Sequence, residues 1–184
     1  MKTLFTNMLL SHLLRKRLLV TIFALLMISL LAGQSSPPSS LPHVEASFHA
    51  AVPRTVEELT ERSIVRDYTA AWENLSGALS SNSIGLLDAY FVGPAKTDLA
   101  SAITHQQESG IRSHYLKQSH KLEVVFYSPE GDVMELHDTT QYDLQLVADG
   151  KTIQEEHVVL RYVVLMTPAA DRWVIRQLQA VPQF

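Results

Sequence analysis

Two successive patterns of apolar residues constrain what this 184-residue chain can fold into. Over residues 55–108 the apolar side chains recur every three to four positions, which predicts amphipathic helices. Over residues 121–181 apolar and polar residues alternate, which is typical of strands with one buried face. Because the helices precede the strands instead of alternating with them, the sequence predicts an α+β domain.

The first half contains three predicted helices. The longest runs from Thr55 to about Leu79, with Thr55 as the N-cap and Glu58 completing a capping box. A short helix is predicted over residues 84–91 and a third over residues 96–108.

The second half is predicted to form a four-stranded antiparallel sheet. The strands are expected over residues 121–127, 133–147, 152–167 and 172–181. The dipeptide Asp149-Gly150 is a strong signal for a two-residue hairpin turn.

The order of these elements resembles that of the nuclear transport factor 2-like superfamily. The resemblance covers most of residues 55–184 and includes Asp88-Ala-Tyr-Phe91 and the closing strand Asp171-Arg-Trp-Val-Ile175. It implies N-terminal helices packed on a curved four-stranded antiparallel sheet that forms a cone. The superfamily includes isomerases, cyclases, dehydratases and many non-catalytic domains, some of them membrane-tethered, so the fold alone does not choose a function.

An apolar run begins at Leu18 and ends at Ala32, directly after a basic N-terminal segment, residues 1–17. A signal-peptide core needs about 7–15 apolar residues, and a membrane-spanning helix needs about 20. Residues 18–33 are therefore predicted to be either a cleaved signal peptide or an uncleaved transmembrane anchor. Either outcome places the following domain outside the cytoplasm, membrane-anchored or secreted.

Composition bounds the rest of the chain. Residues 34–53 begin with a Ser/Pro-rich stretch and are predicted to be a linker, which leaves residues 54–184 as one domain. The chain has no cysteine, so disulfides and thiolate chemistry are excluded. The net charge is −4 and no basic run follows the N-terminus, which disfavours nucleic-acid binding. The eight histidines form no metal-binding motif, and we expect no cofactor and no metal.

Register arithmetic selects a candidate pocket in the sheet. If Asp149 and Gly150 form a tight turn, Ala148 opposes Lys151 and the pairing extends outward from there. This register, continued through the four-residue turn before Arg172, places five polar residues on one face among apolar side chains, namely Asp138, Tyr142, His157, Arg161 and Arg176.

These five residues are the candidate ligand pocket, and Asp138, Tyr142 and His157 are weak catalytic candidates. A carboxylate among apolar residues has a raised pKa and can act as a general base near neutrality. An opposing Arg161 would instead lower that pKa and form a structural ion pair with Asp138. One conflict arises, because the same pairing puts Tyr127 and not Phe126 on this face unless a bulge intervenes.

Three functions remain open. The leading hypothesis is an exported or membrane-anchored non-catalytic domain that binds a partner protein or an apolar small ligand. One alternative is a small isomerase or cyclase-like enzyme, with Asp138 as base and Tyr142 or His157 polarising a carbonyl. Another is an assembly component of an envelope or secretion complex. The expected partners are the membrane, through residues 18–32 if they are uncleaved, and a protein partner or a second copy in a homodimer.

Overall fold

The structure of the protein is a computed structural model that describes residues 41–184. The predicted signal peptide or anchor at residues 18–33 and the basic segment before it lie outside the described residues. Within residues 41–184, no helix is both long enough and apolar enough to cross a membrane.

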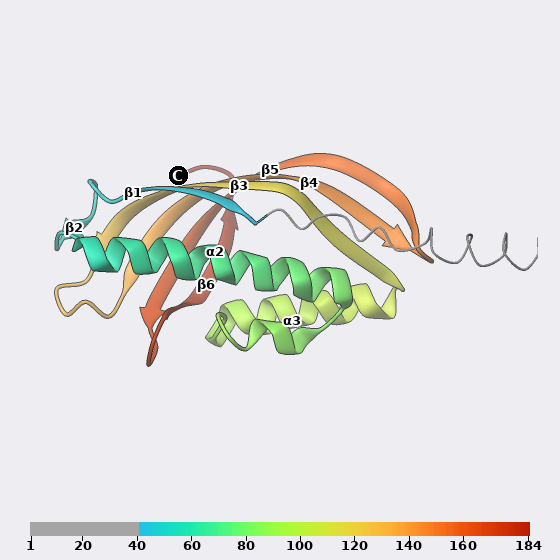
Figure 1. The fold of residues 1–184 in the computed structure, drawn as a ribbon, viewed down its shortest axis with the longest axis horizontal. Coiled ribbons are helices and arrows are strands. Elements are labelled where there is room, and N and C mark those ends of the chain that lie inside the picture. Colours follow the sequence, from blue (N-terminus) through green and yellow to red (C-terminus); the bar gives the residue numbers. More distant parts are fainter. Residues whose placement is uncertain (1–40) are drawn as a thin grey trace, which may run out of the picture. The chain divides into compact units, whose positions relative to one another are not determined.

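A six-stranded mixed sheet forms the centre of the described domain, in the strand order β1-β3-β4-β5-β6 (Figure 1). The strands are β1 (His43–Ser47), β2 (Val52–Pro53), β3 (Ile111–Tyr127), β4 (Met134–Ala148), β5 (Lys151–Pro168) and β6 (Trp173–Val181). Strands β3 to β6 are antiparallel neighbours. Both β1 and β2 pair with β3 in the parallel direction.

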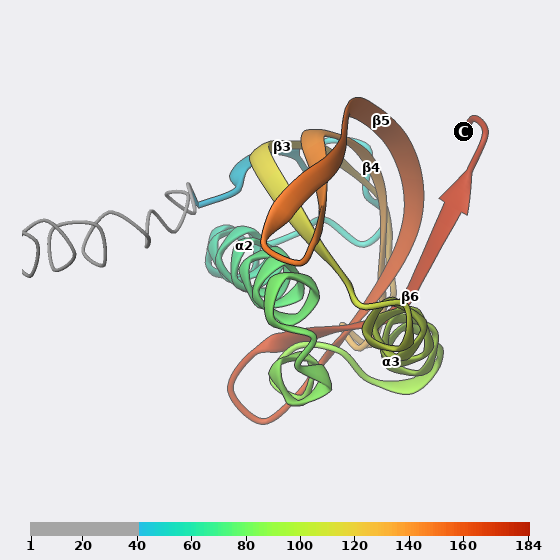
Figure 2. The ribbon, with the colours of Figure 1, turned by 90° about the vertical axis from the view of Figure 1, so that its right-hand side faces the viewer.

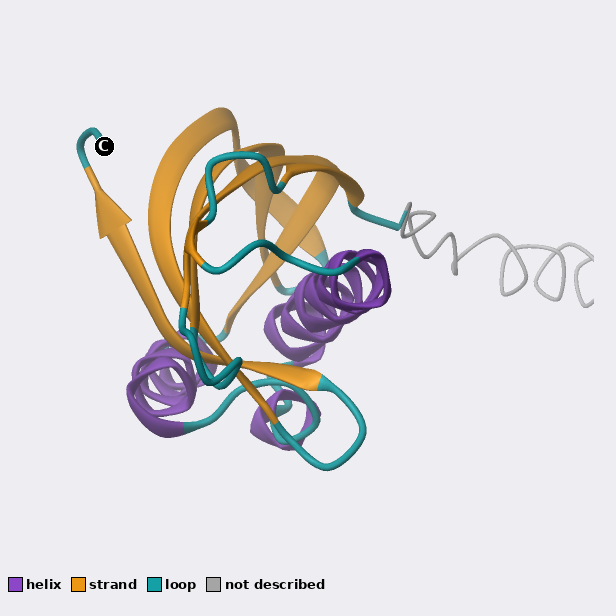
Figure 3. Cartoon of the chain, turned by 90° about the vertical axis from the view of Figure 1, so that its left-hand side faces the viewer, coloured by secondary structure: helices purple, strands orange, loops and turns teal. Residues whose placement is uncertain are grey.

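Two α-helices, α2 (Glu58–Ser81) and α3 (Gly93–Glu108), lie on the same side of the curved sheet (Figure 3). A 3₁₀ helix, η1 (Ile84–Leu87), connects them. We call the sheet face toward α2 the inner face and the opposite one the outer face. The alternation predicted from the sequence follows this division, with Leu122, Leu136 and Val164 all fully or almost fully buried.

The predicted fold class was wrong. We expected N-terminal helices on a curved four-stranded antiparallel sheet of the nuclear transport factor 2-like type, and the structure has a six-stranded mixed sheet. The two additional strands lie within residues 34–53, which the sequence analysis assigned to a linker. They are five and two residues long, too short to produce a periodic pattern, and their pairing with β3 joins segments far apart in the chain.

Helix α2 supplies the side chains that cover the inner face. Its buried positions recur at helical spacing and are Ile64, Asp67, Tyr68, Ala71, Trp72, Leu75, Ala78 and Leu79. The predicted capping box was wrong, because the helix begins at Glu58 with Glu57 at the N-cap position and no side-chain cap. Glu57 instead accepts hydrogen bonds from Arg54, at 2.6 Å from Nη2.

A bulge between Val124 and Phe126 resolves the conflict in the predicted pairing of β3 and β4. Val124 opposes Leu136, and Tyr127 opposes Met134. Val124 and Tyr127 are therefore both buried, whereas Phe126 is 36% exposed. The bulge predicted as one solution is confirmed.

Candidate functional site

A buried aspartate joins three elements on the inner face. Asp138 of β4 is 0% exposed. Its Oδ2 accepts a hydrogen bond from Tyr68 Oη of α2 at 2.8 Å, and Nδ1 of His120 of β3 lies 2.9 Å from the same oxygen. We call Asp138, His120 and Tyr68 the buried triad. It links the helix to the two central strands.

Aromatic rings enclose the buried triad. The rings of Trp72 and His120 lie 4.4 Å apart, and Tyr162 of β5 lies 5.9 Å from Trp72. Burial raises the pKa of Tyr68 well above its usual value, and the charge of Asp138 raises it further. Burial, with smaller contributions from Tyr142 and Asp138, also raises the pKa of Tyr162. Tyr68 therefore remains a protonated donor to Asp138 at neutral pH.

Several buried polar atoms in and beside the triad have no hydrogen-bond partner among the described residues. They are Trp72 Nε1, Gln118 Nε2, His120 Nε2, Asp138 Oδ1 and Thr140 Oγ1. Polar atoms in a protein interior normally bond to other groups or to ordered water. This part of the core therefore has hydrogen-bonding capacity beyond the triad.

The geometry of Asp138 is that of a structural link. A general base must lie within hydrogen-bond distance of the proton that it removes. Both the carboxylate of Asp138 and the ring of His120 are fully buried beneath α2. Neither group is exposed to solvent, so neither contacts a substrate in this conformation.

A bulge in β5 overturns most of the predicted register. Ala148 does oppose Lys151, as predicted. The pairing then shifts by one residue between Leu146 and Val147, because Ile153 has no partner of its own. A shift of one residue exchanges the two faces of a strand for everything beyond it.

The shift separates the five candidate pocket residues. Asp138 opposes Tyr162 and not Arg161, so the predicted ion pair of Asp138 with Arg161 was wrong. Tyr142 opposes Val158 and not His157. Asp138 and Tyr142 share the inner face, where the Tyr142 ring stacks on Tyr115 with a centroid distance of 4.2 Å. His157 and Arg161 lie on the outer face.

Two of the three remaining candidates have partners outside the buried triad, and the third is exposed. His157 Nδ1 lies 2.9 Å from Oδ1 of Asp143. Arg161 donates a hydrogen bond to the carbonyl oxygen of Pro182 at 3.2 Å. Arg176 is exposed, because a second bulge between Leu165 and Met166 leaves it without a partner on β5. The structure therefore does not bring the five residues together.

Two contacts of Asp138, with His120 and with the hydroxyl of Tyr68, were not predicted from the sequence. His120 lies two residues before Leu122, so the alternation of β3 places both on the inner face. Extending the predicted strand towards the N-terminus would have shown this. Tyr68 recurs at helical spacing with the other buried residues of α2, and this spacing indicates packing but not a hydrogen bond.

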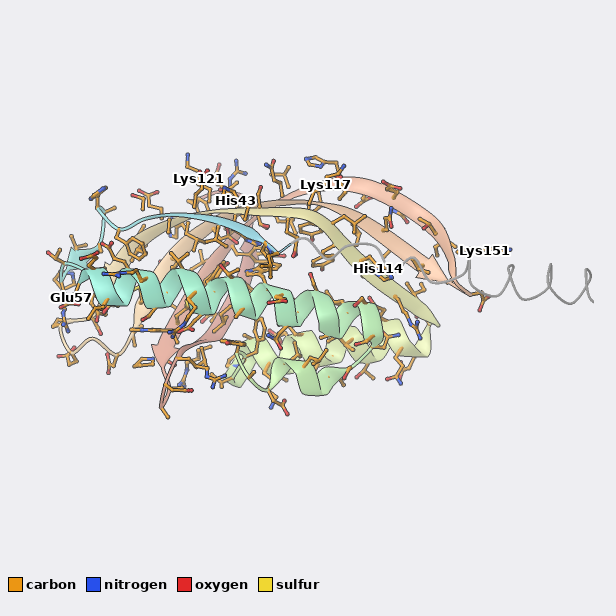
Figure 4. The ribbon with its side chains drawn as sticks, in the orientation of Figure 1. His43, Glu57, His114, Lys117, Lys121 and Lys151 are labelled. Atoms are coloured by element: carbon orange, nitrogen blue, oxygen red, sulfur yellow. The ribbon has the colours of Figure 1, made fainter. Side chains whose placement is uncertain are left out.

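The other distinctive region is one edge of β5. Strand β6 pairs only with Arg161–Pro168, and within residues 41–184 no strand lies beside residues 151–160 on that side. We call residues 151–160 the β5 edge. It belongs to the β4–β5 hairpin that points toward the viewer in Figure 2, with β6 ending away from it. Lys151 marks the hairpin tip, and Glu57 the opposite end of the domain (Figure 4).

The β5 edge is exposed and partly apolar. Every residue from Lys151 to His157 is exposed. Ile153 is 57% exposed and Val159 is 54% exposed. Both are β-branched residues, which favour strand pairing. The exposed edge residues of β6, such as Gln179, are in contrast mainly polar.

A charged cluster on the outer face connects β3, β4 and β5. Asp143 of β4 contacts Lys117 Nζ of β3 at 2.9 Å and His157 Nδ1 of β5 at 2.9 Å. Hydrogen bonds from His157 and then Lys117 lower the pKa of Asp143. Figure 4 shows Lys117 on the side of the sheet away from α2. The described residues contain no cluster of three or more His, Asp or Glu that could hold a metal ion.

Comparisons with known proteins inform the fold alone. No protein-family model and no curated protein matches the chain. A de novo designed β-sheet protein solved by NMR matches 65% of this chain and 88% of its own, with 14% identity and a TM-score of 0.34, too low to support an argument. None of these comparisons tests the resemblance to the nuclear transport factor 2-like superfamily. The intermembrane space region of the chloroplast protein ARC6 matches 70% of this chain and 98% of its own, with 15% identity and a TM-score of 0.50, and this likeness is one of fold.

Proposed function

We propose that this chain is a non-catalytic domain, exported or membrane-anchored, that binds a partner protein through the β5 edge. The observation that carries the proposal is the exposure of this edge together with Ile153 and Val159. Unpaired backbone N–H and C=O groups along an edge strand can bond to an added strand. The exposed side chains of Ile153 and Val159 then provide apolar contacts.

The β5 edge also carries features that restrict nonspecific pairing. Lys151, Glu155 and Glu156 are charged, and Ile153 lies at a bulge. Charges and bulges on edge strands are common protections against aggregation. A partner strand must therefore match both the charges and the altered twist, which makes this edge a selective binding surface.

We further propose that the domain acts outside the cytoplasm, anchored by residues 18–32 or secreted after their cleavage. The basic segment followed by a short apolar run supports this location. The likeness in fold to a region of ARC6 from an intermembrane space is consistent with it. Binding of a partner at the membrane fits a role as an assembly component of an envelope or secretion complex.

The buried triad supports a non-catalytic function. The isomerase-like alternative needs Asp138 beside a substrate, with Tyr142 or His157 polarising it. Asp138 is instead bonded to Tyr68 and to His120 under α2, and His157 lies on the outer face. Of the two polarising groups, only Tyr142 shares the inner face with Asp138, and its ring stacks on Tyr115.

The test is site-specific photo-cross-linking in the native cells. A benzophenone amino acid replaces Val159 in the full-length chain, and a matched variant carries it at Gln179, which is exposed on β6. We expect a protein adduct from position 159 and none, or far less, from position 179. Equal labelling at the two positions, or no adduct at either, would overturn the proposal.

A further inference from the structure

We propose that the partner on the β5 edge is a second copy of this chain, paired antiparallel with Glu156 on the two-fold axis. The inference rests on the proposed function in using the same edge, and it adds the identity of the partner. Such pairing would continue the sheet from one copy into the other and keep the two inner faces on the same side.

The symmetry of two identical strands restricts the possible registers. In an antiparallel dimer, residues equally far from the residue on the axis lie opposite each other, and every off-axis contact occurs twice. With Glu156 on the axis, Ile153 opposes Val159 of the second copy. Glu155 then opposes His157 of the second copy.

In this register, the two exposed aliphatic side chains of the β5 edge form the apolar contact between the copies. Ile153 and Val159 are 57% and 54% exposed; Val159 projects from the outer face, because it opposes Gln141, and Ile153 lies at the bulge where this alternation ends. Cross-strand pairs of β-branched residues stabilise sheets. Pairing in this register places each of these side chains beside an apolar side chain of the second copy.

The polar contact is complementary as well. His157 uses Nδ1 towards Asp143, which leaves Nε2 for a carboxylate of the second copy. Glu155 uses Oε2 to accept a hydrogen bond from Gln145, which leaves Oε1 for that histidine. Because both ring nitrogens would then face carboxylates, His157 can donate to each of them only as an imidazolium, and in that form the pair is an opposite-charge contact across the strands.

The registers with Glu155 or His157 on the axis lose both the apolar and the polar contact. With Glu155 on the axis, Ile153 opposes His157 and Gln154 opposes Glu156. With His157 on the axis, Glu155 opposes the apolar Val159. With Glu156 on the axis, the Glu156 carboxylates of the two copies lie next to each other. In each copy, Gln154 Nε2 donates a hydrogen bond to Glu156 Oε2 at 3.0 Å. We therefore assign the axis to Glu156.

Because the chain has no cysteine, an introduced cysteine supplies the only thiol of the chain for disulfide mapping. In this register, Glu156→Cys places two thiols across an antiparallel pair with Cα atoms about 4.5–5.5 Å apart, which a disulfide can span. We expect full-length E156C in its membranes to form a covalent dimer under mild oxidation. Gln179→Cys, on the exposed edge of β6, is the matched control.

A mixed experiment tests the register itself. Differently tagged E155C and H157C chains should cross-link when mixed and give little dimer when each is alone, because residue 155 opposes residue 157. Adding Val159→Lys to E156C should slow its cross-linking about tenfold, since both Ile–Val contacts are lost. Dimer from E156C no greater than from Q179C would overturn the inference, as would E155C alone matching the mixture.

The photo-cross-linker at position 159 separates this inference from the proposed function. An adduct with twice the mass of the chain supports both. An adduct that contains only a different protein overturns the second copy as occupant while the edge stands as a binding surface. No adduct at position 159 overturns both.

Discussion

Strand β5 passes through two different environments along its length. Near Val164 it lies in the core, where the sheet is covered by α2 and the buried triad connects helix and strands. Between Lys151 and Leu160 it forms the exposed side of a hairpin that has no β6 beside it. One strand thus contributes both to the stability of the domain and to its proposed binding surface.

Burial decides the role of a polar group in this sheet. Asp138 and Asp143 both lie on β4 and both contact a histidine at 2.9 Å. Asp138 is fully buried, so removing its partners would leave an uncompensated polar group in the core. The partners of Asp143 are largely exposed to water, which weakens the pair. The same chemistry is structural in one region and marginal in the other.

The largest expected effect comes from the buried triad. Asp138→Ala leaves the Tyr68 hydroxyl and the His120 ring without their acceptor, and we expect it to destabilise the domain by about 3–5 kcal/mol in urea unfolding. Asp138→Asn keeps an acceptor oxygen and should cost less. Asp143→Ala, on the same strand, is the control and should cause a much smaller loss. A loss below about 1 kcal/mol for Asp138→Ala would refute the structural role.

A matched pair of valines on β5 measures the difference in burial directly. Val164 is fully buried, and Val164→Ala should destabilise by about 2 kcal/mol through lost apolar burial and the cavity that remains. Val159→Ala should change the stability by less than about 0.5 kcal/mol when the protein is dilute. Equal losses in urea unfolding would show that the β5 edge is packed as tightly as the core.

Two glycines occupy turns at opposite ends of the sheet, and their surroundings differ in how closely they are packed. Gly131 and Gly150 both have positive φ, at 78° and 73°. A Cβ on Gly131 would come within 2.6 Å of Arg54 Nη1 and 3.0 Å of Tyr127 Oη, whereas a Cβ on Gly150 meets nothing within 4 Å. We expect Gly150→Ala to destabilise by about 1 kcal/mol from the backbone alone. Gly131→Ala should lose about 1 kcal/mol more, and equal thermal shifts would contradict the contact.

The smallest effect is a pH dependence at the base of the hairpin. The pKa of Asp143 is lowered in the folded state by His157 and Lys117, so its charged form stabilises the fold above the unfolded pKa. That contribution is lost as the pH falls through the folded-state pKa. The urea midpoints of the wild type and of Asp143→Asn should therefore differ most above the unfolded-state pKa and converge as the pH falls through the folded-state pKa. A difference that does not shrink as the pH is lowered would rule out this carboxylate as its source.

Much of the secondary structure could be predicted, because it depends on local periodicity. The long helix was expected to about Leu79 and ends at Ser81. The strand expected over residues 133–147 is β4, Met134–Ala148. The third helix begins earlier than expected, at Gly93, because Pro94 is tolerated in its first turn.

The candidate site was harder to predict than the elements that carry it. Asp138 and Tyr142 were correctly placed on one face, since both lie on β4 and no bulge separates them. His157 and Arg161 were misplaced by the single unpaired residue Ile153 in β5. Nothing in the local sequence distinguishes a hairpin with this bulge from one without it.

Local periodicity was enough to identify the long helix and the strands from residue 121 onward, because the periods of 3.6 and 2 residues are properties of neighbouring positions. The sequence by itself also determined the cysteine-free composition and the apolar run from Leu18 to Ala32. Only the tertiary structure decided that β1 and β2 join the sheet and that His120 is the partner of Asp138. It also decided that residues 151–160 have no neighbouring strand on one side among residues 41–184. These depend on contacts between distant segments, where one inserted residue exchanges the buried and exposed faces of a strand.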